Sequence, residues 1–600
     1  MCPSPASQPN SSVVDGALPR LAQPSSYFVR RIGFAFAVAA TTLALLDWLV
    51  AILAADDEFD LIDFLLSGLF LLYTPCLVIG FYNAALGFAL RRRSVGLQAK
   101  PPSAADGAIS ARTVIAVVMR NEPPARVFAQ LKVMAHSLDR AGYLHCFDFA
   151  ALSDSDRPDV IAAEEAAFAA FRAAMPELRA SYRRRTDHAG FKSGNVHDFC
   201  VHEGRKYDLL LLLDSDSLMT GEAVVRLARD MQANPAVGIL QTLSVGLPSR
   251  SLFSRIFLFG HRHSMRCAMA GAAWWQGDCG HYWGHNCMIR VAPFVTHCSH
   301  FLPDSPLGGR RNVNWSSHDQ IEAALMRAAG YEVRFLPEEG GSYEDNPPAF
   351  PDYLRRYRRW SLGSLQNLGL LTTPGFVPMS RFHLALLAER YGGAAGMLAF
   401  ALLAAWAAAS WPADKPFPVD SALALYMLWL LIYFSPKLFG VADALVRSRQ
   451  SFGGAGRLVL GCLIETAFTV LLAPVSMFAA AAALVRLLFA RPEKWDGQRR
   501  DSYRLTWSAA FAQFWPPTLF GLGLAAFLAV YAPQALPWFL PFVAGLILAV
   551  PFAVVTASNR GGDWAVAQRL CATPEEFAAP PVVAAVRPDL VQNEQLAANR

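Results

Sequence analysis

The sequence is short of charged residues for its length. Only 17% of its 600 residues are Asp, Glu, Lys or Arg, and 54% are hydrophobic, whereas soluble globular chains carry about 25% charged residues. This deficit indicates a membrane protein. The net charge of +5 is too small to give the dense basic face that nucleic-acid-binding proteins show, so we expect no nucleic-acid partner.

The sequence also lacks a cysteine framework and an apolar segment near its start. Its ten cysteines have no regular spacing, so we expect most of them to be reduced. Residues 1–30 are polar and rich in Pro and Ser. This composition favours a disordered cytosolic tail over a cleavable signal peptide.

Long apolar segments lie on both sides of a polar central region. A transmembrane helix needs about 20 mostly apolar residues. We expect two spans within residues 31–93, a folded domain within 94–380 and a bundle of about six spans within 381–558. The apolar segments are Ile32–Ala55, Phe64–Leu90, Ala394–Trp411, Ser421–Val446, Leu458–Ala490, Trp507–Ala532 and Leu536–Ala557. The chain is therefore predicted to cross a lipid bilayer several times.

Basic residues at the ends of these segments predict the orientation, because Lys and Arg stay on the cytosolic side. Arg30 and Arg31 precede the first segment, and Arg91–Arg93 follow the second. The N-terminal tail, the central domain and a C-terminal tail (559–600) are therefore expected in the cytosol.

The segment Leu458–Ala490 lies between two basic loops, so it must cross an even number of times. We predict two spans broken near Pro474, which makes eight in all. Six spans plus an interfacial segment is the alternative. Asp47, Asp443 and Glu465 lie within the apolar segments, where they could line a polymer path or lie at interfaces.

The central region alternates continuous apolar runs with helical patterns. This alternation predicts a mostly parallel sheet covered on both faces, with a site beyond the carboxyl ends of its strands. The expected strands are Thr113–Met119, Phe147–Leu152, Asp208–Leu213 and Val237–Gln241. The expected helices are Ile161–Ala174, Glu222–Met231 and Gln320–Ala329.

Acidic clusters follow two of these strands. Asp214 and Asp216 come directly after an apolar strand, where two carboxylates could share Mg²⁺ or Mn²⁺ beside a diphosphate. Asp154 and Asp156 end another strand, and one of them could accept a hydrogen bond from a nucleobase N–H. A solvated turn is the alternative for Asp154 and Asp156.

Two further motifs supply a cation and a carboxylate. In the segment from His188 to Asn195, Lys192 could face a phosphate, and two glycines permit close approach of the backbone. The alternative is a loop at a helix entry. His318 and Asp319 precede a helical stretch, where Asp319 could act as a general base or only as a helix-capping residue.

Aromatic and basic residues complete the candidate site. Arg356, Arg358, Arg359 and Trp360 could bind phosphate and stack on a sugar, or could form an interfacial helix on anionic lipid. The segment with Trp283, His285 and Asn286 is expected to line an acceptor site. A zinc site built from the nearby His and Cys residues is the alternative, but the cysteines do not form close pairs.

Together these residues resemble the processive family-2 glycosyltransferases, which include cellulose and hyaluronan synthases. The resemblance implies a GT-A-type α/β domain inserted between bundles of transmembrane α-helices, a divalent cation and inverting transfer from a UDP-sugar. Its motifs map onto Asp154, onto Asp214 and Asp216 as the metal-binding pair, and onto Asp319 as the base. In the mechanism that we expect, Asp154 and Lys192 hold the uridine side of the donor. Arg356 stands where the family has Gln, and a guanidinium cannot accept hydrogen bonds.

Four segments are similar to a narrower group, which makes the β-1,2-linked glucose backbone of osmoregulated periplasmic glucans. They are Trp283–Asn286, Ser317–Arg327, Gly341–Glu344 and Arg358–Trp360. The resemblance implies UDP-glucose as donor, a growing glucan as acceptor and the inner membrane of a Gram-negative bacterium. It also suggests an acyl carrier protein and a periplasmic glucan-processing protein as partners, although no motif marks either.

Three other functions compete with this interpretation. One is a related synthase of cellulose, hyaluronan or β-1,3-glucan, because nothing in the residues themselves sets the linkage. Another is a glycosyltransferase that adds one sugar to a lipid carrier. The third is a transporter whose polar domain only binds a nucleotide sugar.

Overall fold

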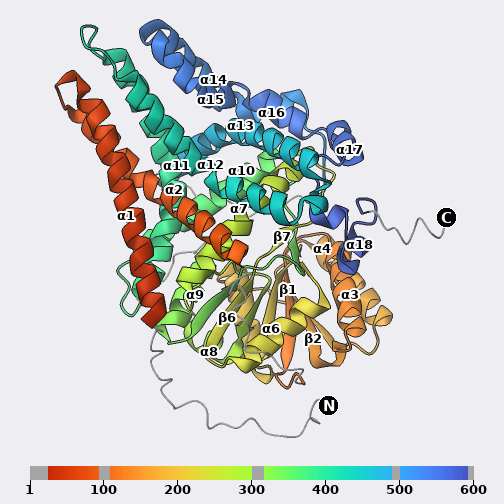
Figure 1. Ribbon diagram of the computed structural model, residues 1–600. Coiled ribbons are helices and arrows are strands. Elements are labelled where there is room, and N and C mark those ends of the chain that lie inside the picture. Colours follow the sequence, from red (N-terminus) through yellow and green to blue (C-terminus); the bar gives the residue numbers. More distant parts are fainter. Residues whose placement is uncertain (1–24, 94–107, 300–316, 489–499, 592–600) are drawn as a thin grey trace.

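The computed structural model of the protein describes residues 25–93, 108–299, 317–488 and 500–591. An α/β domain lies at one end of the molecule, and long helices extend from it at the other end (Figure 1). These helices come from the sequence before and after the domain. The predicted fold class, an α/β domain inserted between groups of membrane-length helices, is confirmed.

The central sheet has seven strands in the order β3-β2-β1-β4-β8-β6-β9. Strand β8 runs antiparallel to both of its neighbours, and the other pairs are parallel. The strands are β1 (Thr113–Met119), β2 (Phe147–Ser153), β3 (Ala180–Arg184), β4 (Leu209–Asp214), β6 (Val237–Thr242), β8 (Cys287–Arg290) and β9 (Glu332–Leu336). The predicted mostly parallel sheet is present, with one reversed strand that the sequence did not indicate.

Alternate residues of the central strands face opposite sides of this sheet, and both sides are buried. Ile115 and Val117 of β1 belong to one core, whereas Val114 and Ala116 belong to the other. The first face is covered by α3 (Pro124–Arg140), α4 (Pro158–Ala174) and α6 (Gly221–Ala233). The second face is covered by α5 (Phe191–His202), α8 (Val291–His297) and α9 (Asp319–Ala328). Burial on both faces explains why the strands are continuously apolar.

A second, smaller sheet has three strands in the order β5-β10-β7. They are β5 (Leu218–Met219), β7 (Val245–Gly246) and β10 (Ser342–Glu344). Strand β5 begins shortly after Asp216, and Glu344 ends β10. This sheet therefore brings the segment from 341 to 346 to the edge where the acidic clusters lie.

Six helices in the described ranges are long and apolar enough to cross a membrane, or up to seven spans if a bent pair counts as one. The six are α1 (Ser25–Leu53), α2 (Leu61–Arg93), α11 (Pro378–Ser410), α12 (Val419–Arg447), α13 (Ala455–Leu488) and α14 (Trp507–Tyr531). The bent pair is formed by Pro533–Ile547, which includes α15 (Leu536–Ile547), and α16 (Ala549–Thr556), with a bend of 56°.

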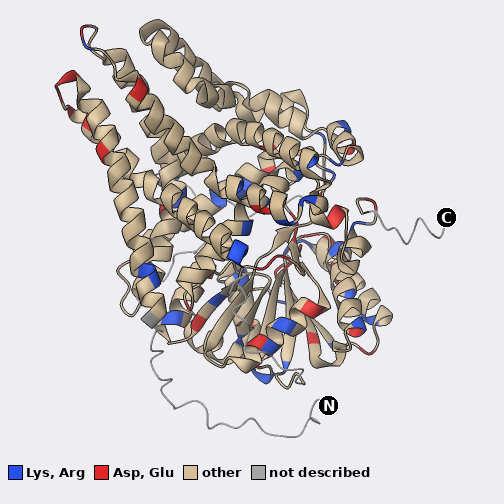
Figure 2. Cartoon of the chain, viewed as in Figure 1, with Lys and Arg blue, Asp and Glu red and all other residues tan. Residues whose placement is uncertain are grey.

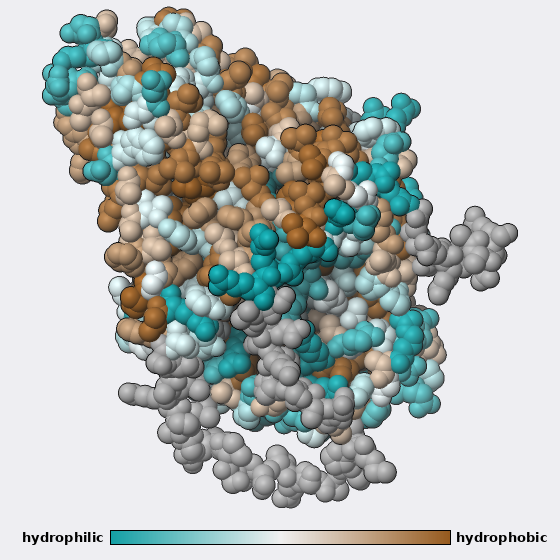
Figure 3. All heavy atoms as spheres, viewed as in Figure 1, coloured by the Kyte–Doolittle hydropathy of each residue, from teal (hydrophilic) through white to brown (hydrophobic). Residues whose placement is uncertain are grey.

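Charge and hydropathy separate the two ends of the molecule. Charged residues gather around the α/β domain and at the ends of the long helices (Figure 2). Hydrophobic residues cover much of the helical part, and hydrophilic residues cover the domain below it (Figure 3). This distribution fits a bilayer around the helices, because lipid-facing surfaces are apolar.

The segment Leu458–Ala490 differs from its prediction. We expected two spans, but α13 continues through Pro474 as one helix. Phe468 of α13 packs against Phe253 of α7 (Leu252–Gln276), with ring centroids 5.2 Å apart. Prolines are tolerated in such helices where neighbouring groups satisfy the freed backbone. The predicted pair of spans in this segment is therefore wrong.

The chain after the last long helix also differs from its prediction as a tail (559–600). Helix α17 (Asn559–Ala567) packs against α7, and α18 (Pro581–Val586) packs against α3. Val583 of α18 is fully buried, and Arg587 Nη2 lies 2.7 Å from Asp345 Oδ1. Residues 559–591 therefore fold onto the α/β domain, and 592–600 lie outside the described residues. At the other end, α1 already begins at Ser25, inside the predicted N-terminal tail.

Helix α7, which the sequence analysis did not predict, joins the α/β domain to the long helices. It crosses α2 at a point where one glycine of each helix faces the backbone of the other helix. A Cβ on Gly87 would lie 1.8 Å from Cys267 O, and one on Gly271 would lie 2.0 Å from Asn83 O. Only glycine permits this approach, as in other close helix crossings.

Two carboxylates suggested for a polymer path instead form ion pairs between helices. Arg91 Nη2 of α2 lies 3.0 Å from Asp443 Oδ2 of α12. Lys437 Nζ of α12 lies 2.6 Å from Glu465 Oε1 of α13. Asp47 is exposed on α1. The pairs at Asp443 and Glu465 indicate a structural role, because buried carboxylates need partners of opposite charge.

Candidate active site

Asp214 and Asp216 lie at the carboxyl end of β4, the middle strand of the sheet. A hydrogen bond from the Asp214 N–H to Ser217 Oγ (3.0 Å) closes the turn between the two carboxylates and β5. Lys192 Nζ contacts Asp214 Oδ1, and Arg500 Nη1 lies 2.5 Å from Asp216 Oδ2. Burial would raise the pKa of Asp214, but Lys192, His285 and Arg500 together outweigh burial and the pKa falls to about 2. Asp214 is therefore an anion at neutral pH.

These carboxylates fit a hard divalent cation that a substrate helps to hold. Mg²⁺ is usually bound by one or two carboxylates together with substrate phosphates and water. In the parts of the chain that the structure describes, no three His, Cys, Asp or Glu residues are grouped so that they could hold a metal ion. Asp214 and Asp216 would therefore need the oxygens of a diphosphate to complete the coordination.

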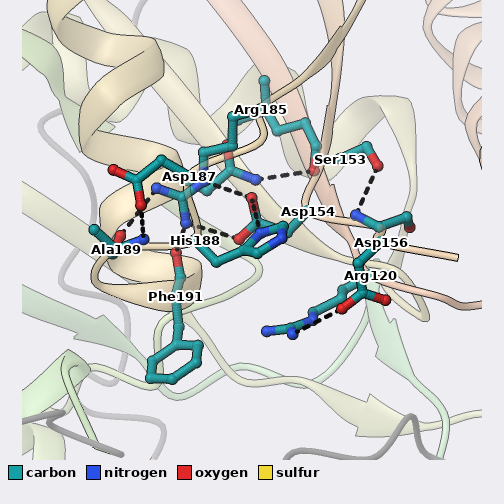
Figure 4. A network of polar contacts seen from close by, with 12 residues as sticks. Arg120, Ser153, Asp154, Asp156, Arg185, Asp187, His188, Ala189 and Phe191 are labelled. Carbon is teal, nitrogen blue, oxygen red and sulfur yellow. Dashed lines mark hydrogen bonds and ion pairs between the residues drawn. The ribbon is translucent and has the colours of Figure 1, made fainter.

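Asp154 follows β2 and forms a bidentate ion pair that the sequence did not predict. Arg185 Nε and Nη2 lie 2.5 and 2.7 Å from the two oxygens of Asp154 (Figure 4). Arg185 also donates to the carbonyls of Ala189 and Phe191, at 2.9 and 2.6 Å. Asp154 is only 2% exposed, so this carboxylate fixes the loop that leads from β3 into α5.

A second buried carboxylate supports the loop around Asp154. Glu164 of α4 accepts hydrogen bonds from Ser153 Oγ (2.7 Å) and Ser155 Oγ (2.5 Å), which flank Asp154. Asp156 differs from Asp154, because it is exposed and bonded to Asn121 Nδ2 at 2.8 Å. The two predicted aspartates therefore have different surroundings, and Asp154 is the one built into the site.

Asp319 begins α9 close to Lys192. Gly284, with φ of +77°, marks their meeting point, because a Cβ there would lie 3.3 Å from Asp319 Cβ and 3.9 Å from Lys192 Nζ. The same Cβ would lie 3.6 Å from His318 Cε1. Ser317 Oγ donates to Asp319 Oδ1 at 3.1 Å. The structure thus brings the predicted base Asp319 beside the lysine that contacts Asp214.

Lys192 lies beside Asp214 rather than beside Asp154. Its ammonium contacts Asp214 at the metal-binding pair, whereas Arg185 contacts Asp154. Burial would lower the pKa of Lys192, but Asp214 outweighs burial and raises it. Lys192 is therefore a cation beside the acidic pair that follows β4.

The loop before β8 is held in place by the sheet edge. The Trp283 N–H donates to Gln241 Oε1 at 2.9 Å. His285 Nε2 lies 3.4 Å from Glu344 Oε2. Burial raises the pKa of Glu344, and His285 opposes that shift. Trp283 and His285 are thereby placed between β8 and the small sheet, next to Gly284.

Two predicted substrate-binding asparagines are turned into the protein. Asn195 Nδ2 donates to Leu152 O at 3.2 Å, and the residue is 1% exposed. Asn286 Nδ2 donates to Ser342 Oγ and to Tyr343 O, both at 3.0 Å. These contacts tie α5 and the loop before β8 to the sheets, and substrate contact by either side chain stays a prediction.

Helix α10 (Phe350–Gln366) carries the predicted basic and aromatic cluster. Arg356 Nη2 donates to Asn346 Oδ1 at 3.2 Å, and its guanidinium lies 4.7 Å from the ring centre of Trp360. Trp360 is 43% exposed. Arg358 and Arg359 lie on the same helix. The whole predicted cluster is therefore carried by α10, which precedes α11 in the chain.

The cationic partners of the predicted carboxylates could not be predicted from the sequence. Arg185 and Arg500 lie far from Asp154 and Asp216 along the chain, and neither belongs to a motif with its partner. Arg500 belongs to the second of the two basic loops that flank the segment Leu458–Ala490. Ion pairs of this kind depend on how the chain folds, so no local pattern could have indicated them.

The site has a carboxylate pair after β4 and a further carboxylate at the start of α9. This arrangement is typical of enzymes that transfer sugars. A family model described as "Glycosyl transferase family group 2" matches residues 209–555, which include these carboxylates and the long helices after them. The chain belongs to the family-2 glycosyltransferases.

The relatives define the group within this family. Curated proteins named glucans biosynthesis glucosyltransferase H match the chain over most of its length. The protein from Xanthomonas euvesicatoria pv. vesicatoria is 31% identical over 97% of this chain and 93% of its own length. The protein from Caulobacter vibrioides is 34% identical over 87% of this chain and 80% of its own length. The resemblance that the sequence motifs indicated is therefore confirmed.

A solved structure is also similar to the chain. It is the mannosyltransferase PcManGT from Pyrobaculum calidifontis in complex with GDP-Man and Mn²⁺. The match has 15% sequence identity and a TM-score of 0.37, and it covers 61% of this chain and 99% of that chain.

Proposed function

We propose that the protein polymerises glucose from UDP-glucose into the linear β-1,2-glucan backbone of osmoregulated periplasmic glucans. The meeting of Asp319 and Lys192 at Gly284, together with the contact between Lys192 and Asp214, carries this proposal, because it would place a base beside an anion-binding cation and a metal-binding pair. The name and the similarity of the relatives support glucose as the sugar and a glucan as the product. The enzyme would work as a processive, inverting transferase.

The donor would bind across the carboxyl ends of β2 and β4. The loop fixed by Asp154 and Arg185 would hold the uridine, and Asp214 and Asp216 would hold Mg²⁺ or Mn²⁺ against the diphosphate. That cation would neutralise negative charge on the leaving UDP. Lys192, Arg358 and Arg359 would add positive charge at the same end.

Asp319 would remove the proton from a hydroxyl of the acceptor glucose as that oxygen attacks C1 of the donor. The bond between C1 and the phosphate oxygen breaks on the opposite side, so the α-linked donor gives a β-linked product. The bonding electrons leave with UDP, where the cationic side chains stabilise them. Ser317, bonded to Asp319, would keep the base oriented toward the acceptor.

A row of tyrosines supports passage of the product from this site toward the long helices. Tyr353 and Tyr357 of α10 have ring centroids 5.9 Å apart, and Tyr357 lies 5.2 Å from Tyr391 of α11. Trp360 and Trp283 would stack on the sugars nearest the active site, because aromatic rings present flat apolar faces. The glucan would then leave between the helices toward the periplasm.

Contacts at helix ends support six crossings, made by α1, α2, α11, α12, α14 and the bent pair of α15 and α16, with the catalytic domain in the cytosol. Arg31 at the start of α1 pairs with Asp278 of the domain at 2.5 Å. At the opposite end of the helices, Asp57 after α1 pairs with Lys415 between α11 and α12 at 2.5 Å. Arg500, before α14, reaches the metal-binding pair, so α13 would start and end on the cytosolic side as an interfacial helix. We assign the protein to the inner membrane of a Gram-negative bacterium.

Product analysis tests this function. The protein in membranes is supplied with radiolabelled UDP-glucose and Mg²⁺, and linkage analysis of the polymer is expected to give β-1,2-glucan. Asp214→Ala should abolish incorporation, whereas the exposed Asp156→Ala should keep it. Incorporation only from another UDP-sugar would overturn the donor assignment, and a single sugar on lipid would overturn the polymerase assignment.

The partners beyond donor and acceptor rest on the family resemblance alone. An acyl carrier protein and a periplasmic glucan-processing protein would act with this enzyme in glucan synthesis. Co-purification from native membranes, compared with a strain that produces the Asp214→Ala variant, would test both.

A further inference from the structure

Glu322 is a buried carboxylate that no step of the reaction described above uses. It lies on α9, one turn after Asp319, and is 1% exposed. Three side chains from separate segments meet it. Ser193 Oγ donates to Oε1 at 2.5 Å, Tyr282 OH donates to Oε2 at 3.1 Å, and His318 Nδ1 lies 3.1 Å from Oε1.

Each of these three residues is the immediate neighbour of a predicted active-site residue. Ser193 follows Lys192, which contacts Asp214. Tyr282 precedes Trp283 in the loop before β8, and His318 precedes Asp319. One carboxylate therefore contacts three segments, which carry the diphosphate-binding cation, the sugar-stacking ring and the base.

We infer that Glu322 is a positioning residue that sets the base Asp319 against Lys192 and Trp283, so that donor and acceptor meet in reacting geometry. This inference rests on the proposed function. Glu322 touches neither substrate, and it acts through the hydroxyls of Ser193 and Tyr282 and the imidazole of His318.

The chemistry of the group explains why a carboxylate is needed. An ionised carboxylate only accepts hydrogen bonds, and its two oxygens can hold three donors at once. Leaving such a group buried without its donors is costly, so the three segments are held together as long as Glu322 is charged. Burial would lower the pKa of His318, but Glu322 outweighs burial and raises it. His318 Nδ1 thus pairs with Glu322 directly beside the base.

Glu322→Gln tests the inference, because its amide keeps the shape but loses the charge and turns an N–H toward one of the donors. We expect the turnover number for glucosyl transfer to fall by about 100-fold, since a misplacement of about 1 Å can have that effect. The affinity for UDP should change much less. Asp230→Asn is the matched control, because Asp230 is also a buried helix carboxylate of this domain (6% exposed) but contacts no site residue.

Hydrogen exchange provides a readout that does not depend on the sugar donor. Glu322→Gln should speed amide exchange in the peptides covering residues 190–196, 280–286 and 317–322 together, and leave α3 and α6 unchanged. Tyr282→Phe, which removes one donor and keeps the ring, should affect mainly 280–286.

The two readouts separate this inference from the proposed function. If wild-type protein makes no glucan from UDP-glucose, the proposed function fails, and the exchange pattern still decides the role of Glu322. Unchanged exchange in all three segments would overturn the inference. Faster exchange throughout the domain would also overturn it, because Glu322 would then be only a stability residue.

Discussion

Arg500 Nη1 lies 2.5 Å from Asp216 Oδ2, although one residue precedes a long helix near the end of the chain and the other follows β4. The guanidinium of Arg500 is paired with a carboxylate oxygen that a divalent cation would need as a ligand. Arg126, close by on α3, contacts both Asp345 and Asp501. The segment that leads into α14 is thus linked by ion pairs to the edge of the sheet where the predicted metal ligands lie.

This ion pair predicts the metal dependence of the Arg500→Gln variant. In this variant, Asp216 does not have to break an ion pair with Arg500 before it binds a metal ion. We expect the Mg²⁺ concentration for half-maximal activity to fall by about tenfold. This change corresponds to a free energy of about 1.4 kcal/mol for breaking the partly buried ion pair. Activity measured against Mg²⁺ concentration checks this. Arg504→Gln, at an exposed arginine of the same segment, should behave like wild type.

A second prediction concerns the ion pair at Asp154. Asp154→Asn would leave Arg185 buried without its charge partner, which typically costs about 3–5 kcal/mol. The loop from β3 to α5 would lose its anchor, so we expect the KM for UDP-glucose to rise more than kcat falls. Steady-state kinetics and UDP binding measure the two effects. The exposed Asp156→Asn serves as control, and equal effects of the two variants would contradict the prediction.

Gly284 gives a prediction about space in the active site. Gly284→Ala would place a Cβ at φ of +77°, 3.3 Å from Asp319 Cβ and 3.9 Å from Lys192 Nζ. Backbone strain there amounts to about 1–2 kcal/mol, and the methyl group would also displace the base or the lysine. Gly142→Ala is the control, because its φ is +78° and nothing lies within 4 Å of its Cβ. Both variants should lose similar stability in thermal unfolding, but only Gly284→Ala should lose most of its turnover.

The pair formed by His318 and Glu322 predicts a pH dependence of stability. The pKa of folded His318 is raised, whereas an unfolded histidine titrates near about 6.5. The folded state therefore binds the proton more tightly, so its contribution to the free energy of unfolding is complete below about pH 6.5 and is lost as pH rises through the folded pKa. Thermal unfolding in detergent at a series of pH values should show this decline in wild type. The decline should be absent in His318→Asn, and an identical slope in both proteins would refute the assignment.

The packing of the C-terminal segment gives the last prediction. Val583 of α18 is fully buried against the core around α3. Val583→Asp would bury a carboxylate without a partner, so we expect the domain to lose several kcal/mol of stability. Residues 559–591 should also become sensitive to protease. Ala585→Asp, at an exposed position of the same helix, should leave both thermal unfolding and proteolysis unchanged.

Whether a segment could be predicted depends on how far apart in the sequence the residues that stabilise it lie. The strand Thr113–Met119 was predicted to the residue, because a continuous β-branched run bounded by loop residues is a local signal. The prediction of two spans around Pro474 was wrong, because the basic loops and the proline had indicated a break between two helices. Helix α13 stays whole because contacts with α7 and other helices support it. Helix α7 was missed because its apolar residues face both the domain and the long helices.

The sequence by itself determined that the chain has an α/β domain between apolar helices and that the carboxylates Asp154, Asp214, Asp216 and Asp319 follow strands or begin a helix. Periodicity, apolar length and motif spacing are local, so they can be read along the chain. Only the tertiary structure decided which cation faces which carboxylate: Arg185 with Asp154, Lys192 with Asp214 and Arg500 with Asp216. Those pairings join segments far apart in sequence, and the packing of the whole domain and its helices selects them.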